Sequence, residues 1–378
     1  MVGFAAHRRQ RIRCRRRAGT VLRRVVAPPP PGMGEPFRTG CPSDRPPVVT
    51  QRGEPAAPSA GDELTPDQHA VCDWLRCSTS WLDRVPYPGS GATRDRWRVL
   101  VDIATQDLAR ARLAEGHLDA RAILAELRVD VPGGLVWGVW AAEPHLLRAE
   151  RSRDGWQLRG EKRWCSGSTG LDRALVTATA DDGPRLFVVD PRDLFPLPHS
   201  WPALAMSATA SVTVRFDLTV NEQAAIGAPG AYVERPGFWH GSAGVAACWY
   251  GGTLAIAARL REAADRADSG RLDAVSGRVR AQLENVGALL AHGADEIDRT
   301  PNDRGAANAR ALRLRIAAED AARWVILETA RALGPSPLAF EPVHARRVAD
   351  LELYLCQLRP ELAAAELGAL RCDAPVGW

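Results

Sequence analysis

The chain has 378 residues, of which 46% are hydrophobic and 25% are charged, which is the balance of a soluble globular protein with room for two or three packed domains. It contains no run of eighteen apolar residues, so no membrane-spanning helix is expected. The eight cysteines form no CxxC pair, which excludes the usual zinc modules and disulfide-rich secreted scaffolds. We therefore expect a cytoplasmic protein with reduced thiols and no metal site.

The net charge of +4 is unevenly distributed along the chain. Residues 1–60 carry twelve of the 49 basic residues and only three of the 45 acidic ones, so the remaining chain is negatively charged. The same segment is rich in Pro, Gly and Arg and has little with which to form a core, so a disordered tail is predicted over 1–61. An RNA-binding arm and a targeting peptide are the alternatives for this tail, but the acidic remainder predicts no nucleic-acid partner.

A helical N-terminal domain is predicted over residues 62–130. The segment 94–113 places Trp97, Val101 and Leu108 on one face at three- to four-residue spacing, which is typical of an amphipathic helix. Gly116 is expected to end this helix, and a second helix is expected over 118–127.

The periodicity changes after residue 130, and a small antiparallel β domain is predicted over 131–230. Apolar residues alternate or run together in short segments bounded by turn residues, as strands do. The sequence Asp181-Asp182-Gly183 is a typical hairpin turn between two of these segments. The expected strands cover 155–160, 174–180, 185–190 and 210–220.

A C-terminal four-helix bundle is predicted over residues 231–378. Long helical patterns are separated by connections that contain Pro301, Pro335 and Pro337. Four helices of this length are expected to pack as an antiparallel bundle. They cover 238–265, 272–297, 306–333 and 344–367.

The order of helices, β domain and bundle, together with several short motifs, resembles the acyl-CoA dehydrogenase family over about residues 94–370. Trp140-Ala-Ala-Glu-Pro144 resembles the family's T-E-P turn. Gly160-Glu-Lys-Arg-Trp-Cys-Ser-Gly167 resembles its G-x-K-x-W-I-[TS] strand, and Arg346-Arg-Val-Ala-Asp350 resembles its R-D region. The order and spacing of these motifs carry more weight than any one of them.

The resemblance implies an α+β flavoprotein that holds FAD between the middle domain and the bundle. It implies oxidation of an acyl thioester, in which a carboxylate takes the α proton and the β carbon transfers a hydride to flavin N5. Trp164 is expected against the flavin ring, and Ser166 is expected to donate a hydrogen bond to N5. Backbone contacts to the pyrimidine edge are expected from Ala141 and Ala142. The expected cofactor-binding set is completed by Trp140 and Cys165.

Partners and the catalytic base are less fully specified by the resemblance. A homodimer or homotetramer is expected, and the electron acceptor stays open. The family's usual glutamate lies eight residues after the aspartate of the R-D region, but that position is Leu358, which cannot accept a proton. Some members place the base on the first bundle helix, ten residues before a glycine. That spacing from Gly244 predicts Glu234 as the base.

Two alternatives share the fold. His240, beside Trp239 on the first bundle helix, favours a flavin-dependent monooxygenase of the same fold. The absence of the family's A-G-S-D segment after Pro144 and of its R-x-x-F-G motif near 266–282 favours a degenerate, non-catalytic homologue.

Overall fold

The computed structural model describes residues 51–52, 65–267 and 269–370. The sequence-based predictions for 1–50, 53–61 and 371–378 lie outside these residues. Residues 51–52, which the sequence assigns to the tail, form strand β1 (Gln51–Arg52), and this strand pairs antiparallel with Leu218 and Thr219 of strand β8 (Val212–Val220).

The region after residue 65 is helical, as predicted, although the bounds of its helices differ from the prediction. It contains α1 (Pro66–Leu82), α2 (Thr93–Gln106) and α3 (Leu108–Glu126). The break between α2 and α3 falls at Asp107, so the prediction of a break at Gly116 was wrong. Asp107 has extended backbone angles, and its side chain accepts a hydrogen bond from the Arg110 amide at 2.9 Å, which makes it the N-cap of α3. Gly116 lies inside α3, next to strand β2 (Trp137–Trp140).

The β domain forms one sheet, in which the described residues contribute nine strands. Most neighbours run antiparallel, as predicted, but β2 and part of β3 pair parallel with β5. The hairpin at residues 181–182 is confirmed, because Ala180 pairs with Gly183 across it. The strand order is β1-β8-β4-β3-β5-β6-β9, with β2 on β5 and β7 on β8. The remaining strands are β3 (Leu147–Ser152), β4 (Gly155–Cys165), β5 (Arg173–Ala180), β6 (Gly183–Val189), β7 (Phe195–Pro196) and β9 (Ala225–Ile226).

The C-terminal domain is helical, but its last long helix is interrupted. The helix expected over 344–367 is two helices, α9 (Pro342–Leu355) and α10 (Pro360–Ala369), joined by a turn. Pro360 explains the break, because proline lacks an N–H and disfavours helical geometry in the preceding residue. The other helices are α4 (Ala231–Glu234), α5 (Pro236–Arg266), α6 (Gly270–Arg299), α7 (Arg304–Leu333) and α8 (Ser336–Phe340).

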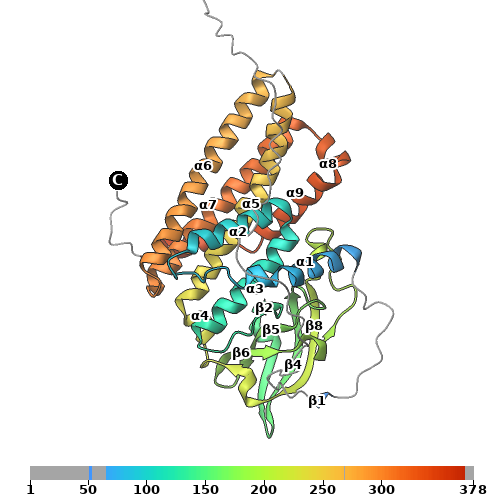
Figure 1. Ribbon diagram of the computed structural model, residues 1–378, viewed down its shortest axis with the longest axis vertical. Helices are drawn as coiled ribbons and strands as arrows, with labels where there is room; N and C mark the ends of the chain where they lie inside the picture. The colour runs from blue at the N-terminus through green and yellow to red at the C-terminus, as the bar shows by residue number, and fades with distance from the viewer. Residues whose placement is uncertain (1–50, 53–64, 268, 371–378) are drawn as a thin grey trace, which may run out of the picture. The chain divides into compact units, whose positions relative to one another are not determined.

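Helix α3 lies where the sheet and the long helices meet (Figure 1). It packs on β2 and also contacts α2, α5 and α9. Because both sides of α3 are covered, polar side chains such as Glu115, His117 and Arg121 are buried, and buried charges require partners.

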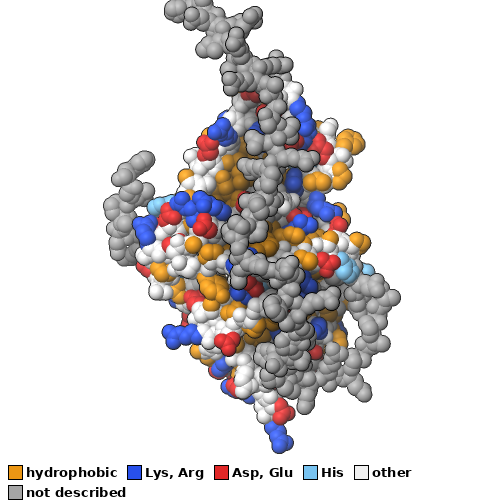
Figure 2. All heavy atoms as spheres, in the orientation of Figure 1, with side chains coloured by type: hydrophobic (Ala, Val, Ile, Leu, Met, Phe, Trp, Pro, Cys, Tyr) orange, Lys and Arg blue, Asp and Glu red, His pale blue; other side chains and the backbone are white. Residues whose placement is uncertain are grey.

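The face shown in Figure 2 has acidic and basic side chains interspersed among the described residues, without one large basic patch. In the described part of the chain, no helix combines the length and the apolar character needed to span a bilayer.

Candidate active site

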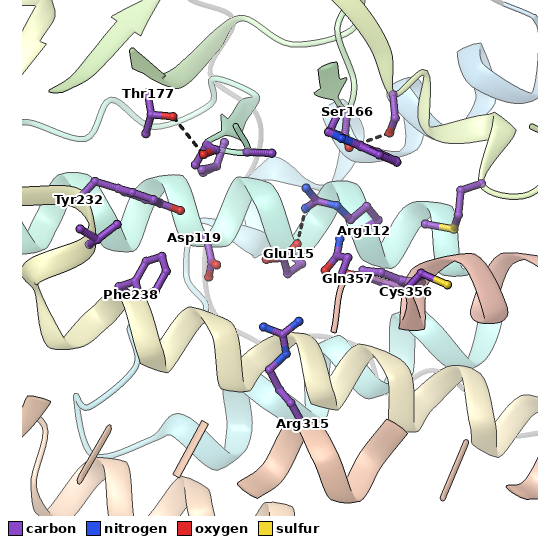
Figure 3. Close-up of a pocket in the computed structure, with 18 of the residues that line it drawn as sticks. Arg112, Glu115, Asp119, Ser166, Thr177, Tyr232, Phe238, Arg315, Cys356 and Gln357 are labelled. Atoms are coloured by element: carbon purple, nitrogen blue, oxygen red, sulfur yellow. Dashed lines mark hydrogen bonds and ion pairs between the residues drawn. The ribbon is translucent and has the colours of Figure 1, made fainter. Parts of the chain in front are cut away.

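A cavity of about 720 Å³ opens between the sheet and the helices (Figure 3). One side, which we call the sheet wall, includes Ala141, Ala142, Trp164, Ser166 and Ser211. The opposite side, which we call the helical wall, includes Arg112, Glu115 and Asp119 of α3 and Arg315 of α7. The volume is within the range of pockets that hold cofactors and small substrates, roughly 300–1,000 Å³.

Trp164 projects into the cavity because strand β4 bulges at this residue. The pairing of β4 with β8 shifts register between Lys162 and Cys165, and Trp164 has a φ of 66°. Such a left-handed conformation is rare for a bulky residue, and bulges are a common means of redirecting a side chain. The indole is 47% exposed and meets Trp201 edge-on, with ring centroids 5.5 Å apart.

Strained backbone gathers around this cavity. Glu143, Trp164, Met206 and Ala210 all have positive φ although none is glycine. Trp164 and Met206 line the cavity, and the other two directly adjoin lining residues in the sequence. Each such residue costs on the order of 1–3 kcal/mol and persists only where the surroundings enforce it, which is typical of ligand sites.

A chain of buried hydroxyl groups continues the sheet wall. Ser166 Oγ and Ser211 Oγ are 2.7 Å apart, and Ser211 Oγ is 2.7 Å from Thr209 Oγ1. Thr209 donates in turn to the Met206 carbonyl at 2.7 Å. Because that donation uses the Thr209 proton, Ser211 donates to Thr209 and Ser166 donates to Ser211. The Ser166 oxygen therefore offers acceptor lone pairs to the cavity, and not the proton donor that the resemblance implies.

The turn at Ala141 and Ala142 is held from behind by Lys162, the only lysine in the sequence. The fully buried Lys162 Nζ donates to the Ala142 carbonyl at 2.7 Å and to the Thr177 carbonyl at 2.9 Å. Thr177 Oγ1 donates to the Ala141 carbonyl at 3.1 Å. Burial lowers the pKa of Lys162 to about 8, although the nearby Cys165 and Glu143 oppose this shift. These bonds fix the backbone at the edge of the cavity.

Of the six expected cofactor-binding residues, the structure brings Ala141, Ala142, Trp164 and Ser166 together on the sheet wall, while Trp140 and Cys165 do not line the cavity. Trp140 lies in the core and donates from Nε1 to the Ser166 carbonyl at 2.9 Å. Cys165 is fully buried, and burial raises the pKa of its thiol to about 12. Both residues therefore support the wall from behind.

The residue predicted as the base does not line the cavity, although its neighbour Val233 does. Glu234 is exposed at the end of α4 and is not among the lining residues. Leu358 is buried in the turn between α9 and α10, so no carboxylate takes its place there. Glu361, just beyond it, is exposed in the first turn of α10.

His240 is also separate from the main cavity. It is buried, and its Nε2 lies 2.8 Å from the Pro301 carbonyl oxygen. It lines a smaller cavity of about 400 Å³, together with Asp119 and Glu126. Asp119 is thus the side chain that borders both spaces.

The acidic side chains that do face the main cavity are Glu115 and Asp119, on successive turns of α3 (Figure 3). Glu115 is 7% exposed and is ion-paired with Arg112. Burial raises the pKa of Glu115 to about 7; Asp119 contributes to this increase, whereas Arg112 opposes it. Asp119 accepts from Arg96 at 2.9 Å. A carboxyl group that titrates near neutrality in a cavity is a candidate acid–base group.

Sequence reasoning missed Glu115 because the break predicted at Gly116 placed this residue between two expected helices, and because the charged residues of α3 are typical of a solvated helix. Its Arg112, Glu115 and Asp119 follow the three- and four-residue spacing typical of ion pairs on a solvated helix surface. The one available signal was the surrounding run of Ala and Leu from 108 to 124, which favours a helix buried on several sides.

Arg315 completes the helical wall. Its guanidinium points from α7 toward Glu115 and Asp119 across the cavity (Figure 3). It donates to Ser242 Oγ at 2.8 Å and lies 5.0 Å from the centre of the Trp249 ring. Burial lowers the pKa of Arg315 to about 10, with nearby Tyr354 and Glu115 opposing this shift.

Sequence comparison gives no match, either to the sequence model of a known family or to a curated protein. Structural comparison does. Butyryl-CoA dehydrogenase from Megasphaera elsdenii matches with a TM-score of 0.64 at 14% identity, covering 81% of this chain and 98% of that one. Dibenzothiophene monooxygenase (TdsC) from Paenibacillus sp. A11-2 matches with a TM-score of 0.65 at 14% identity, covering 80% and 95%.

A third structure, XiaF from Streptomyces sp. in complex with FADH2 and glycerol, matches with a TM-score of 0.62 at 16% identity, covering 82% of this chain and 97% of that one. The chain therefore has the acyl-CoA dehydrogenase fold, which confirms both the resemblance and the predicted fold class. Because proteins of different activity share this fold, the chemistry has to be argued from the cavity.

Proposed function

We propose that this protein is a flavin-dependent oxidoreductase that binds FAD against the sheet wall of the cavity. The observation that carries the proposal is the half-exposed indole of Trp164, which is held in a strained bulge and lines the same cavity as Glu115, whose pKa is raised to about 7. Structures of the same fold support it, since TdsC has been solved with FMN and XiaF with FADH2.

The residues of the sheet wall fit a flat heteroaromatic ring. The Trp164 indole offers an apolar face, and the small side chains of Ala141 and Ala142 leave the backbone accessible. The Ser166 hydroxyl, held by its donation to Ser211, would offer an acceptor oxygen to a ring N–H. These residues would hold the flavin, and when bound the flavin would supply a hydride acceptor.

Glu115 is the proposed base, in place of the predicted Glu234. It would take a proton from a carbon next to a carbonyl group, and Arg112 would hold its carboxylate in place during the transfer. Loss of this proton and of a hydride from the adjacent carbon leaves a C=C bond in the substrate. An acyl thioester, or a related carbonyl compound, is the proposed substrate.

A monooxygenase is the second candidate. The aromatic residues Trp164, Trp201, Phe238 and Tyr232 line the cavity, as suits a planar aromatic substrate, and TdsC, with the same fold, has been solved with indole. In this case the protein would use reduced flavin and molecular oxygen.

Flavin binding tests the proposal directly. The purified full-length chain should be yellow and should release FAD on denaturation, which chromatography against FAD and FMN standards identifies. Trp164→Ala should weaken flavin binding at least about tenfold, because stacking and apolar contact are lost together. The matched variant Trp81→Ala changes a partly exposed indole outside the cavity and should leave the affinity unchanged. A colourless chain that binds neither flavin would contradict the proposal and favour a non-catalytic homologue.

Oxygen distinguishes the two candidate reactions. Bleaching of the bound flavin by members of an acyl-thioester and carboxylic-acid panel without oxygen would support dehydrogenation. Bleaching only by an added reductant, followed by substrate-dependent oxygen consumption, would support the monooxygenase instead.

A further inference from the structure

Arg315 is the one guanidinium of the helical wall that has no carboxylate partner among the described residues. Its nearest polar contact is the neutral Ser242 hydroxyl, at 2.8 Å. Its Nε is buried and makes no hydrogen bond to the described residues. Trp249 covers one face of the guanidinium. The group is thus held in position by neutral neighbours and keeps its charge directed at the cavity.

The charges at this end of the cavity do not balance. Three guanidinium groups, those of Arg96, Arg112 and Arg315, meet two carboxylates, those of Glu115 and Asp119. Arg112 pairs with Glu115, and Arg96 pairs with Asp119 at 2.9 Å, which leaves Arg315 over. Protonation of Glu115, whose pKa is near 7, increases the positive excess. A buried cation without a counter-charge is costly, so an anion entering the cavity would be stabilised there.

Two other arginines that line the cavity do not offer the same site. Arg185 already pairs with Asp182 of the hairpin, and Arg359 is exposed in the turn before α10. Interaction with water weakens the attraction of an exposed guanidinium for an anion, whereas enclosure strengthens that of Arg315.

We infer that the substrate of this cavity carries an anionic oxygen group, such as a carboxylate, and that Arg315 binds it on the helical wall. This inference rests on the proposed function, because it takes the sheet wall to be the flavin side. Since Arg315 faces Glu115, the anionic group would lie close to the carbon that loses its proton. A guanidinium binds a planar carboxylate through two parallel N–H donors, which would also orient the substrate.

Benzoate and its neutral isostere benzamide are suitable probes, because they differ in charge but little in shape. Calorimetry with the flavin-loaded full-length protein should show benzoate binding at least about tenfold tighter than benzamide. Arg315→Met should remove this preference, Arg315→Lys should retain part of it, and the matched Arg359→Gln should leave it within about twofold. Circular dichroism and the thermal midpoint check that each variant is folded.

Two results would overturn the inference: equal affinity of the wild type for benzoate and benzamide, or an undiminished benzoate preference in folded Arg315→Met. The first result needs only the wild type, so it tests the inference even if Arg315→Met does not fold.

The phosphate of a flavin nucleotide is the other possible source of the anion. Riboflavin lacks that phosphate, so the ratio of FMN to riboflavin affinity in apoprotein reports on it. The inference requires that Arg315→Met leaves this ratio unchanged; selective loss of FMN affinity would assign Arg315 to the cofactor phosphate and overturn it. A chain that binds benzoate through Arg315 but binds no flavin would contradict the proposed function instead, so the two failures are distinguishable.

Discussion

The two walls of the cavity differ in charge and in origin. The residues named for the sheet wall are uncharged, and Trp164 and Ser166 lie within three positions of each other, at the end of β4 and directly after it. The helical wall is charged, and Glu115 and Arg315 come from helices two hundred residues apart in the sequence.

This difference separates two tasks. A neutral wall of aromatic, hydroxyl and small residues can hold a flat ring without titrating as the pH changes. An enclosed group of charges can exchange protons near neutrality and can select a substrate by its charge. Substitutions on the sheet wall should therefore affect cofactor affinity, and substitutions on the helical wall should affect turnover.

The largest effect is expected for Glu115→Gln. Loss of a general base typically lowers the rate by about 10²- to 10⁴-fold, while flavin affinity should stay within about twofold because the sheet wall is intact. Stopped-flow absorbance measures the rate of flavin reduction, with any substrate of the panel that bleaches the wild type. Fluorescence titration measures the flavin affinity. Glu234→Gln is the matched control and should reduce the flavin at the wild-type rate. The opposite pattern would restore Glu234 as the base.

The pH dependence sharpens the same test. The pKa of Glu115 is raised to about 7 by burial, so the base is ionised and active above that pH and protonated below it. The rate of flavin reduction should therefore rise with pH through about 7 and then level off. Arg112, Asp119 and Arg315 line the cavity with Glu115, along with Tyr354 from α9. Arg112, Arg315 and Tyr354 keep their charge state across this window, because the pKa of each lies well above 8. A profile that is flat between pH 6 and 8 would exclude Glu115 as the base.

The next largest effect is expected behind the sheet wall, at Lys162. Lys162→Met removes the ammonium group that donates to the Ala142 and Thr177 carbonyls, so both carbonyl oxygens lose this hydrogen bond. We expect a loss of about 3 kcal/mol in the free energy of unfolding, measured with urea. Arg163→Met, the adjacent exposed position, breaks one surface ion pair with Glu143 and should cost less than about 1 kcal/mol. Equal losses in the two variants would show that the buried ammonium does not support the wall.

The sheet wall could be predicted from the sequence because its signals are local. The run Gly160 to Gly167 contains the end of β4, Lys162 and the projecting indole within eight residues. Its resemblance to the G-x-K-x-W-I-[TS] strand of the acyl-CoA dehydrogenases was enough to predict Trp164 and Ser166 as site residues, and both line the cavity. Trp140 and Cys165 were included by proximity alone. The geometry of the strands turns both into the core, which a list of neighbouring residues cannot show.

The helical wall could not be predicted in this way. Whether Glu115 is a surface charge or a buried acid depends on α3 being covered by the sheet on one side and by the long helices on the other. Spacing along the chain placed the base at Glu234, but α4 is a short exposed helix and leaves that carboxylate outside the cavity. The break between α2 and α3 shows the same limit, because the capping side chain of Asp107 outweighed the expected effect of Gly116.

Asp350 ties the helices to the strained loop of the sheet domain, and a smaller effect is expected there. Its carboxylate accepts from the Met206 amide, and burial raises its pKa to about 6 from a usual 3.8. Because the folded state holds this proton more tightly than the unfolded state, Asp350 lowers the stability progressively as pH rises from about 4 to about 6.

Asp350→Asn keeps an acceptor for the amide but does not titrate. It should be more stable than the wild type by about 2–3 kcal/mol above pH 6, with the difference disappearing below pH 4. Urea unfolding at pH 4 and 7.5 measures this difference. Asp67→Asn, in an exposed ion pair with Arg346, should show no comparable change between the two pH values.

The smallest effect is expected for the buried hydroxyl groups of the sheet wall, where two variants distinguish a loss of flavin affinity from a loss of folding stability. Ser211→Ala removes the hydroxyl that orients Ser166, and Ser168→Ala removes another buried hydroxyl, which donates to the Ala210 carbonyl at 3.2 Å but does not line the cavity. Ser211→Ala loses two hydrogen bonds and Ser168→Ala loses one, so the unfolding free energy should fall by about 2 and about 1 kcal/mol, respectively. Only Ser211→Ala should also weaken flavin binding, by a few-fold, since only its hydroxyl chain ends at a side chain that faces the ring. If both variants bind flavin as the wild type does, the hydroxyl chain is structural and Ser166 does not contact the cofactor.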